Sequence, residues 1–421
     1  RKIPSNRLKT LVPDASLSTG TPIGSCASAG TNHQVHIPLA IRRNHGHVIG
    51  LPGQGKSVLL QNMLLDDFRR GAGVVVFDPH GDLIEHVLRV LPAEEIPRVV
   101  YFSPGDPDWV PLWNPLRPIL GQDVGRIADD LVGAFKKFVE HWGDRLEHLL
   151  RNIFYSALCL TQCTLQDVSN LLRPQNNVAL RQKILQAVEN DSARQFWLQD
   201  FARYGKDDFG PPRNKLSKLL LAGNVSLMLS QPVSAIKLHE VMDDGKLLLI
   251  NLSGVGSQVR GFLGSLMLSL IHLTALTRSS IPDDQRKEVN IYCDEAHLFL
   301  TESLEEIIAE TRKFNVSLML AHQFMSQFTT RKTDALLSVG STIIFNVNPD
   351  DAEHLKRNLQ KLVVADDLTA LEPWQAIARI GTHIVRSRTS PPPKEAGAGH
   401  REDIIRYCHE RYYRPSQEVR A

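Results

Sequence analysis

Short apolar runs separated by amphipathic stretches fill two regions of this chain. Runs typical of buried strands occur at residues 48–50, 73–78, 98–102, 246–252, 289–293, 315–321 and 342–347. A further strand pair is predicted near 374–385 and a helix at 401–413, after the Pro391–Pro393 break. Buried strands that alternate with helical patterns are typical of a parallel sheet, so we predict an α/β fold.

The pattern between these two regions is different, because apolar positions recur at helical spacing almost throughout residues 122–243. Such stripes indicate the core of a helical domain. The first 32 residues are rich in Pro, Ser, Gly and Thr, and we expect a lead-in segment of low order. The predicted organisation is a lead-in at 1–32, a first core segment at 33–117, an all-α domain at 118–243, a second core segment at 244–392 and a C-terminal helix or tail at 393–421.

The segment from Gly50 to Ser57 fits the phosphate-loop pattern G-x-x-x-x-G-K-[ST], with an apolar strand before it and an amphipathic helix after it. We expect Lys56 to neutralise the β- and γ-phosphates of ATP and the Ser57 hydroxyl to bind Mg²⁺. A glycine-rich turn that matches by chance is the alternative. The residues expected to contact the nucleotide are Gly50, Pro52, Gly53, Gln54, Gly55, Lys56 and Ser57.

Two carboxylates, Asp294 and Glu295, end the apolar run at 289–293. In phosphate-loop enzymes an Asp at this place holds Mg²⁺ and a neighbouring Glu polarises the attacking water, so Asp294 is the predicted metal residue and Glu295 the predicted base. A surface strand end that carries two acids is the alternative. The tetrapeptide Asp294–His297 also fits a superfamily-two helicase, but no late helicase motif rich in glycine and arginine accompanies it.

Gln323 follows the apolar run at 315–321. A polar residue at the tip of the strand beside the acidic strand senses the γ-phosphate in RecA-type motors, and Gln323 is the predicted sensor. An ordinary amide that caps the following helix is the alternative.

Five motifs in order resemble the HerA/FtsK superfamily, and within it the type IV secretion coupling proteins of the TraG/TraD-like conjugative DNA-transfer ATPases. The resemblance runs from about residue 34 to 388. It implies a RecA-like phosphate-loop core with a central, mostly parallel sheet, interrupted by an inserted all-α domain, that assembles into a ring, usually a hexamer. The motifs are the phosphate loop, the 77–82 turn, residues 113–116, the acidic tetrapeptide 294–297, and the segment from Arg312 to Gln323.

The resemblance also implies an arginine finger, for which Arg312 is the first candidate, followed by Arg278 and Arg386. Each could equally form a surface ion pair. The role of the turn from Asp78 to Asp82 stays open between capping the following helix and contacting the nucleotide or a neighbouring subunit.

DNA contacts are expected from loops that line the hole of a ring. The turn at 253–260, which includes Arg260, and the segment at 329–332, which includes Arg331 and Lys332, carry suitable charge. Contacts to phosphates would be independent of DNA sequence and sensitive to salt. Plain solvated charge is the alternative for Arg331 and Lys332.

The net charge of the chain is near neutral, because 48 basic residues oppose 46 acidic ones among 421. Any nucleic-acid contact must therefore be a local patch.

The five cysteines are spaced too irregularly for a zinc site or a disulfide framework, which favours the cytoplasm. No apolar run approaches about 18 residues and no signal peptide is found, so no membrane span is expected. The chain starts at Arg1, as a fragment would, and an upstream anchor would hold it at the inner membrane.

These observations predict a ring-forming, Mg²⁺-dependent ATPase that moves DNA, and the resemblance implies a relaxase and secretion channel as its partners. One alternative is a HerA-like DNA-processing or phage-defence motor with a nuclease partner. Another is an ATP-stabilised ring that recruits protein without moving DNA.

Overall fold

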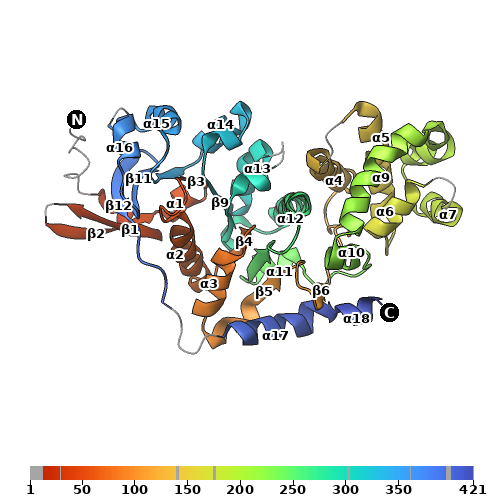
Figure 1. The fold of residues 1–421 in the computed structure, drawn as a ribbon, viewed down its shortest axis with the longest axis horizontal. Helices are drawn as coiled ribbons and strands as arrows, with labels where there is room; N and C mark the ends of the chain where they lie inside the picture. Colours follow the sequence, from red (N-terminus) through yellow and green to blue (C-terminus); the bar gives the residue numbers. More distant parts are fainter. Residues whose placement is uncertain are drawn as a thin grey trace. The chain divides into compact units, whose positions relative to one another are not determined.

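The computed structural model describes residues 13–28, 30–138, 142–173, 177–300, 304–360, 362–394 and 400–420. The start of the expected lead-in, residues 1–12, lies outside this range. The chain forms two compact units, coloured along the sequence in Figure 1. The first unit takes residues 1–99, 240–250 and 281–404, and the second takes 100–239, 251–280 and 405–421. The domain boundaries predicted from the sequence stay a prediction.

The first unit is built on a large sheet in which the strand order is β2-β1-β12-β11-β10-β3-β9-β8-β4-β7. Neighbouring strands from β10 through β3, β9 and β8 to β4 run parallel, and β11, β12, β1 and β2 extend the sheet with antiparallel pairs. The fold is therefore α/β with a mostly parallel centre, as predicted. The strands are β1 (Thr21–Ser28), β2 (Thr31–Ile37), β3 (Gly46–Ile49), β4 (Gly73–Asp78), β7 (Leu247–Asn251), β8 (Val289–Cys293), β9 (Val316–His322), β10 (Ser341–Ile344), β11 (Gln375–Ile380) and β12 (His383–Arg388).

The central strands β3, β4, β8 and β9 are buried at every position. Strands covered on both faces carry continuous apolar runs, which explains why these strands were visible in the sequence. Figure 1 shows α2 and α3 on one side of this sheet and α13 and α14 on the other. The helices of this unit are α1 (Leu39–Arg42), α2 (Lys56–Arg69), α3 (Asp82–Val90), α13 (Leu304–Thr311), α14 (Thr330–Leu337), α15 (Pro349–Leu355) and α16 (Ala365–Thr369).

The expectation of low order across residues 1–32 is wrong for the hairpin of β1 and β2. Ile23 and Cys26 of β1 are buried, and β1 pairs with β12. Gly24 has a φ of 136°, and a Cβ there would lie 2.2 Å from the carbonyl oxygen of Arg388. This glycine therefore serves a close backbone approach at a strand irregularity, whereas in the sequence it reads as a turn residue.

The second unit is mostly helical. Phe135 of α4 packs against Phe154 of α5 and Phe262 of α12, with ring centroids 5.1 and 4.8 Å apart. Strands β6 (Trp109–Pro111) and β13 (Tyr413–Pro415) pair within this unit. Its helices are α4 (Val124–Phe138), α5 (Asp144–Leu158), α6 (Leu165–Leu171), α7 (Val178–Ala187), α8 (Asp191–Gln195), α9 (Lys206–Leu220), α10 (Gly223–Leu229), α12 (Ser257–Thr277) and α18 (Ser416–Arg420).

Four elements contain a boundary between the two units: β5 (Val99–Phe102), α11 (Leu238–Asp243), β7 and α17 (Arg401–Tyr412). Among the described residues, one helical stretch, Ser257–Ser280, is long and apolar enough to span a membrane, and 83% of its apolar window is buried in the structure. Scattered Ser, Thr and His residues interrupt this run in the sequence without making it polar on average. Burial is what a core helix shows.

Candidate functional site

The phosphate loop joins β3 to α2 and has the backbone that phosphate binding requires. Gly53 and Gly55 adopt φ values of 73° and 111°, which side chains disfavour, and α2 begins directly after Gly55 without a side-chain cap. The first N–H groups of this helix are thus left without a side-chain partner, which favours an anion. Pro52, Gly53 and Ser57 are exposed, so this side of the loop is accessible.

Lys56 is buried and folds back onto its own loop. Its Nζ donates to the carbonyl oxygens of Gly50 and Leu51, at 2.6 and 3.1 Å. Burial lowers the pKa of Lys56, while the charges of Asp294 and Glu295 oppose that shift. A phosphate that replaced these carbonyl contacts would restore the charge compensation that burial removes.

Trp374 contacts the phosphate loop at Gln54 and Gly55. Its backbone N–H donates to the Gln54 carbonyl at 2.9 Å, and a Cβ on Gly55 would lie 3.3 Å from its ring. Trp374 has a φ of 72°, which is rare for a bulky side chain and indicates a backbone held by its surroundings. No sequence motif pointed to this residue, which lies more than 300 positions after the loop.

The two predicted carboxylates lie at the carboxyl end of β8. Burial and the neighbouring charges of Asp78 and Glu295 raise the pKa of Asp294 to about 7. Glu295 is buried and has a φ of 46°, a left-handed backbone that costs a non-glycine residue about 1–3 kcal/mol. Strain of this kind is found at functional sites, where the surrounding structure holds it in place.

The predicted sensor contacts the predicted base. Gln323 follows β9, the strand next to β8, and its Nε2 donates to Oε1 of Glu295 at 2.5 Å. The structure therefore brings Lys56, Asp294, Glu295 and Gln323 to the carboxyl ends of the neighbouring strands β3, β8 and β9. Their roles in catalysis stay a prediction.

His297 lies beside the base and was not among the predicted site residues. Its Nδ1 is 3.4 Å from Oε2 of Glu295, and its Nε2 is 3.3 Å from Nε2 of Gln327. Oε1 of Gln327 accepts from the backbone N–H groups of Gln323 and Phe324, at 3.2 and 3.0 Å. The tetrapeptide 294–297 contained the signal for His297, whereas Gln327 has none in the sequence.

The Asp78 turn makes the capping contacts that were one of its two expected roles. The Asp78 carboxylate accepts from the backbone N–H groups of His80, Gly81 and Ile84, at 2.9, 2.8 and 3.0 Å. These bonds fix the start of α3, so Asp78 acts as a capping residue whose charge also reaches Asp294.

Two buried histidines join the phosphate-loop strand to the sensor strand. His47 of β3 and His322 of β9 stack with ring centroids 4.6 Å apart, and their Nε2 atoms are in contact. Burial lowers the pKa of His47 to about 3 and that of His322 well below its usual value, so both rings are neutral at neutral pH.

The three arginines proposed as fingers occupy different surroundings. Arg312 is exposed, in a short 3-10 turn that precedes β9. Arg278 is buried in the second unit. Arg386 of β12 donates to Oε1 of Gln375 at 2.5 Å. Arg312 thus has the side chain most available to a second subunit.

The expected DNA residues lie on helices, and the expectation of a loop at 329–332 is wrong. Thr330 to Leu337 form α14, where Arg331 is exposed and paired with Glu305, with Nε–Oε1 and Nη2–Oε2 distances of 2.5 and 2.8 Å. Nζ of Lys332 is 3.4 Å from the Leu300 carbonyl. Residues 330–337 contain neither Gly nor Pro, so they can form a helix even though the Thr329 side chain makes no capping hydrogen bond.

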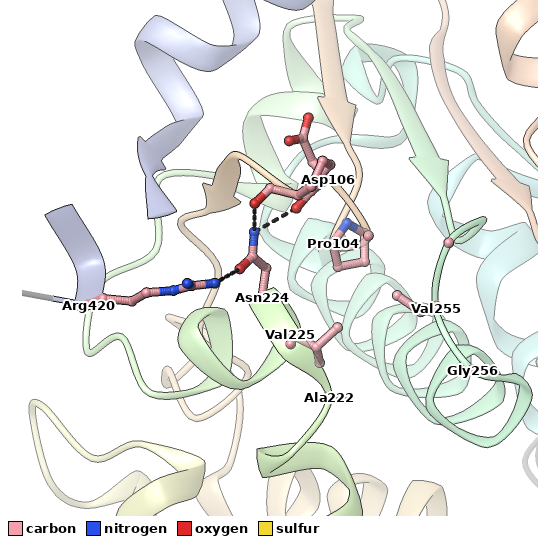
Figure 2. Close-up of a pocket in the computed structure, with 12 residues that line it drawn as sticks. Pro104, Asp106, Ala222, Asn224, Val225, Val255, Gly256 and Arg420 are labelled. Carbon is pink, nitrogen blue, oxygen red and sulfur yellow. Dashed lines mark hydrogen bonds between the residues drawn. The ribbon is translucent and has the colours of Figure 1, made fainter. Parts of the chain in front are cut away.

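Arg260 lies in the first turn of α12, where its Nη2 donates to the Val255 carbonyl at 3.3 Å. Within the second unit, the turn before α12 lines a pocket of about 430 Å³ (Figure 2). Asn224 donates there to the carbonyls of Asp106 and Pro107 and accepts from Arg420 at 3.3 Å. The lining residues are Pro104, Gly105, Asp106, Pro107, Ala222, Gly223, Asn224, Val225, Gly254, Val255, Gly256 and Arg420.

Comparison with known proteins identifies relatives of this fold. The family described as "Type IV secretion-system coupling protein DNA-binding domain" matches residues 31–367. The plasmid coupling protein TrwB in complex with the non-hydrolysable ATP analogue ADPNP is similar, with a TM-score of 0.64, 16% identity and 94% of each chain covered. TrwB in complex with ADP and Mg²⁺ gives 0.61 and 15%, with 95% of each chain covered. VirB4 of Thermoanaerobacter pseudethanolicus gives 0.60 and 16%, with 91% of this chain and 98% of that chain covered. No curated protein matches in a sequence search.

Proposed function

The chain belongs to the family of type IV secretion-system coupling protein DNA-binding domains, and on that premise we propose that it is a ring-forming, Mg²⁺-dependent ATPase that translocates DNA. The solved relatives, at 15–16% identity, establish the RecA-like coupling-protein fold. The activity is our inference from this chain's own residues. We propose that the protein acts in the cytoplasm.

One observation carries the proposal. A phosphate loop, a carboxylate pair and a glutamine converge at the carboxyl ends of the adjacent parallel strands β3, β8 and β9. Ligands of open α/β sheets bind outside this end of the strands. A nucleoside triphosphate with a divalent cation fits the donor set, because Lys56 and uncapped N–H groups supply positive charge and Asp294 supplies a carboxylate for the metal.

The geometry supports a role for each of these residues in the reaction. Lys56 exchanges its bonds to Gly50 and Leu51 for phosphate oxygens. Asp294 and Ser57 would hold Mg²⁺, which would supply positive charge to offset that of the phosphates. Glu295 orients water and accepts its proton, and Gln323, bonded to Glu295, reports whether the γ-phosphate is present. TrwB has been solved with an ATP analogue and with ADP and Mg²⁺, which supports this choice of ligands.

Arg312 supports assembly into a ring. Arg312 precedes β9, and Gln323 follows β9. The seven residues of this strand therefore place about 20 Å between Arg312 and Gln323 at the usual rise per residue. That span is too long for Arg312 to reach its own catalytic end of the sheet. A neighbouring subunit is therefore the partner we propose for this arginine.

DNA is the proposed cargo, held through sequence-independent phosphate contacts. Arg331 is exposed on α14, and Arg260 and Arg420 lie at or near the turn before α12. The matched family is itself described as a DNA-binding domain. A relaxase and a secretion channel are the partners that a coupling protein would serve.

The test is ATP turnover by the purified chain with and without DNA of unrelated sequences. Wild type should hydrolyse ATP, and DNA should accelerate turnover. Glu295→Gln should bind ATP with wild-type affinity but lose about 10²- to 10⁴-fold in turnover, because it keeps the shape and loses the base. Lys56→Ala should lose both binding and turnover. Wild-type turnover by Glu295→Gln would refute the assigned base, and ATPase activity indifferent to DNA would favour a protein-recruiting ring.

A further inference from the structure

We propose that His297 and Gln327 are positioning residues. They hold the Glu295 carboxylate in a fixed position relative to the turn after the sensor strand. This inference rests on the proposed function, since it concerns the base of the same reaction. Glu295, His297, Gln323 and Gln327 form a closed circuit of contacts, and every member belongs to the first unit.

The direction of each contact follows from the donors available. Oε1 of Gln327 accepts from two backbone N–H groups, so the opposite atom of this amide, which faces His297, is the donor nitrogen Nε2. Nε2 of His297 must then accept. A neutral imidazole that accepts at Nε2 carries its proton on Nδ1, and Nδ1 is the atom that faces Glu295.

Each oxygen of Glu295 therefore has a nitrogen of another side chain near it. Oε1 accepts from Gln323 at 2.5 Å, and Oε2 lies 3.4 Å from Nδ1 of His297. Oε2 and Nδ1 are both buried, and at this distance neither atom makes a hydrogen bond to the other. The second contact is long for a hydrogen bond, as catalytic hydrogen bonds often are before the substrate arrives. A carboxylate has about four acceptor positions, so two contacts leave room for the water that it must orient.

The strained backbone of Glu295 explains why its carboxylate needs these contacts. Its left-handed conformation is unfavourable for glutamate, and the following 3-10 turn, Ala296–Leu298, carries His297 back toward the carboxylate. A base that sits on a strained turn needs side-chain contacts to keep one orientation. Because Gln327 also binds the backbone at residues 323 and 324, a movement of the sensor turn is transmitted to the base through His297 as well as through Gln323.

The experiment separates turnover from nucleotide affinity in full-length variants. His297→Leu removes both ring nitrogens, whereas His297→Asn retains a donor near the position of Nδ1. We expect kcat of His297→Leu to fall about 10- to 100-fold, the loss typical of one hydrogen bond to a charged group, with ATP affinity unchanged. His297→Asn should recover most of that loss, because it still donates to Glu295.

A double-mutant cycle tests the circuit itself. Gln327→Met keeps the side-chain length and removes the donor to His297, so it should lower kcat. In the variant with both His297→Leu and Gln327→Met, the losses should not multiply, because the two residues act as one unit. Wild-type kcat in His297→Leu, equal rates for His297→Leu and His297→Asn, a parallel loss of ATP affinity, or multiplying losses would each overturn the proposal. Absence of turnover in wild type would instead overturn the proposed function.

Discussion

Replacing Asp294 by Asn should stabilise the nucleotide-free protein at alkaline pH. Burial and the charges of Asp78 and Glu295 raise the pKa of Asp294 from its usual 3.8 to about 7. A raised pKa in the folded state means that the protonated carboxyl is the favoured form. The folded protein therefore loses stability through this group as pH rises from about 4 to about 7, and stays at the lower value above that.

The size of this stability loss follows from the difference between the unfolded and the folded pKa of Asp294. Each pH unit between the unfolded and the folded pKa corresponds to about 1.36 kcal/mol, so an interval of about three units gives an upper bound of about 4 kcal/mol. Asp294 keeps some solvent contact, and we expect about half of this bound. Asparagine resembles the protonated acid, so the advantage of the variant should be near zero at pH 4 and should reach about 2 kcal/mol above pH 7.

Urea unfolding midpoints, followed by intrinsic fluorescence between pH 4 and pH 9 in a chelating buffer, measure this difference. Asp350→Asn, which removes an exposed carboxylate from α15, controls for net charge and should show no such trend. Excess ATP with Mg²⁺ should reverse the order above pH 7, because wild type binds the metal complex and the variant lacks a metal ligand. An advantage that does not change with pH, or a less stable variant at pH 8, would refute the reasoning.

Two further changes test the ring and the DNA path. Arg312→Ala should leave the ATP affinity of the monomer intact and lower turnover of the assembled ring by about 10³- to 10⁵-fold, and mixing it with Lys56→Ala subunits should restore some of the activity. Failure of that rescue with normal assembly would show that Arg312 acts in its own subunit or is structural. Changing Arg331 and Lys332 together to Ala should weaken DNA binding equally for unrelated sequences and flatten its salt dependence by a slope of about 0.7 to 0.9 per lost contact, whereas Glu305→Gln, which releases Arg331, should strengthen binding. Unchanged affinity and slope in the double variant would move the DNA path toward Arg260.

The features that the sequence predicted well depend on local signals. The strands β3, β4, β8 and β9 are buried on both faces, so they carry unbroken apolar runs, and the phosphate loop needs its glycines and Lys56 at fixed spacing. The contact of Gln323 with Glu295 could be anticipated only because adjacent parallel strands bring their carboxyl ends together.

The features that the sequence did not predict depend on tertiary contacts. The charged start of α14 was expected to be a loop, yet Arg331 pairs with Glu305 from another helix. Gln327 has no motif, and its importance appears only when its amide is seen between a backbone turn and His297. Trp374 reaches the phosphate loop through a left-handed backbone that composition does not reveal.

The hairpin of β1 and β2 affects how far this protein can be shortened without aggregating. Strand β1 pairs with β12 at Ser25 and Arg388, on the side of β12 that would otherwise present unpaired N–H and C=O groups, and β1 itself has an irregular register near Gly24. A version cut to begin at the phosphate-loop strand would leave β12 as a bare edge strand. Such an edge recruits other chains, so the shortened protein should aggregate even though its nucleotide site is complete. We therefore expect the hairpin, which carries none of the predicted catalytic residues, to protect the chain from aggregation.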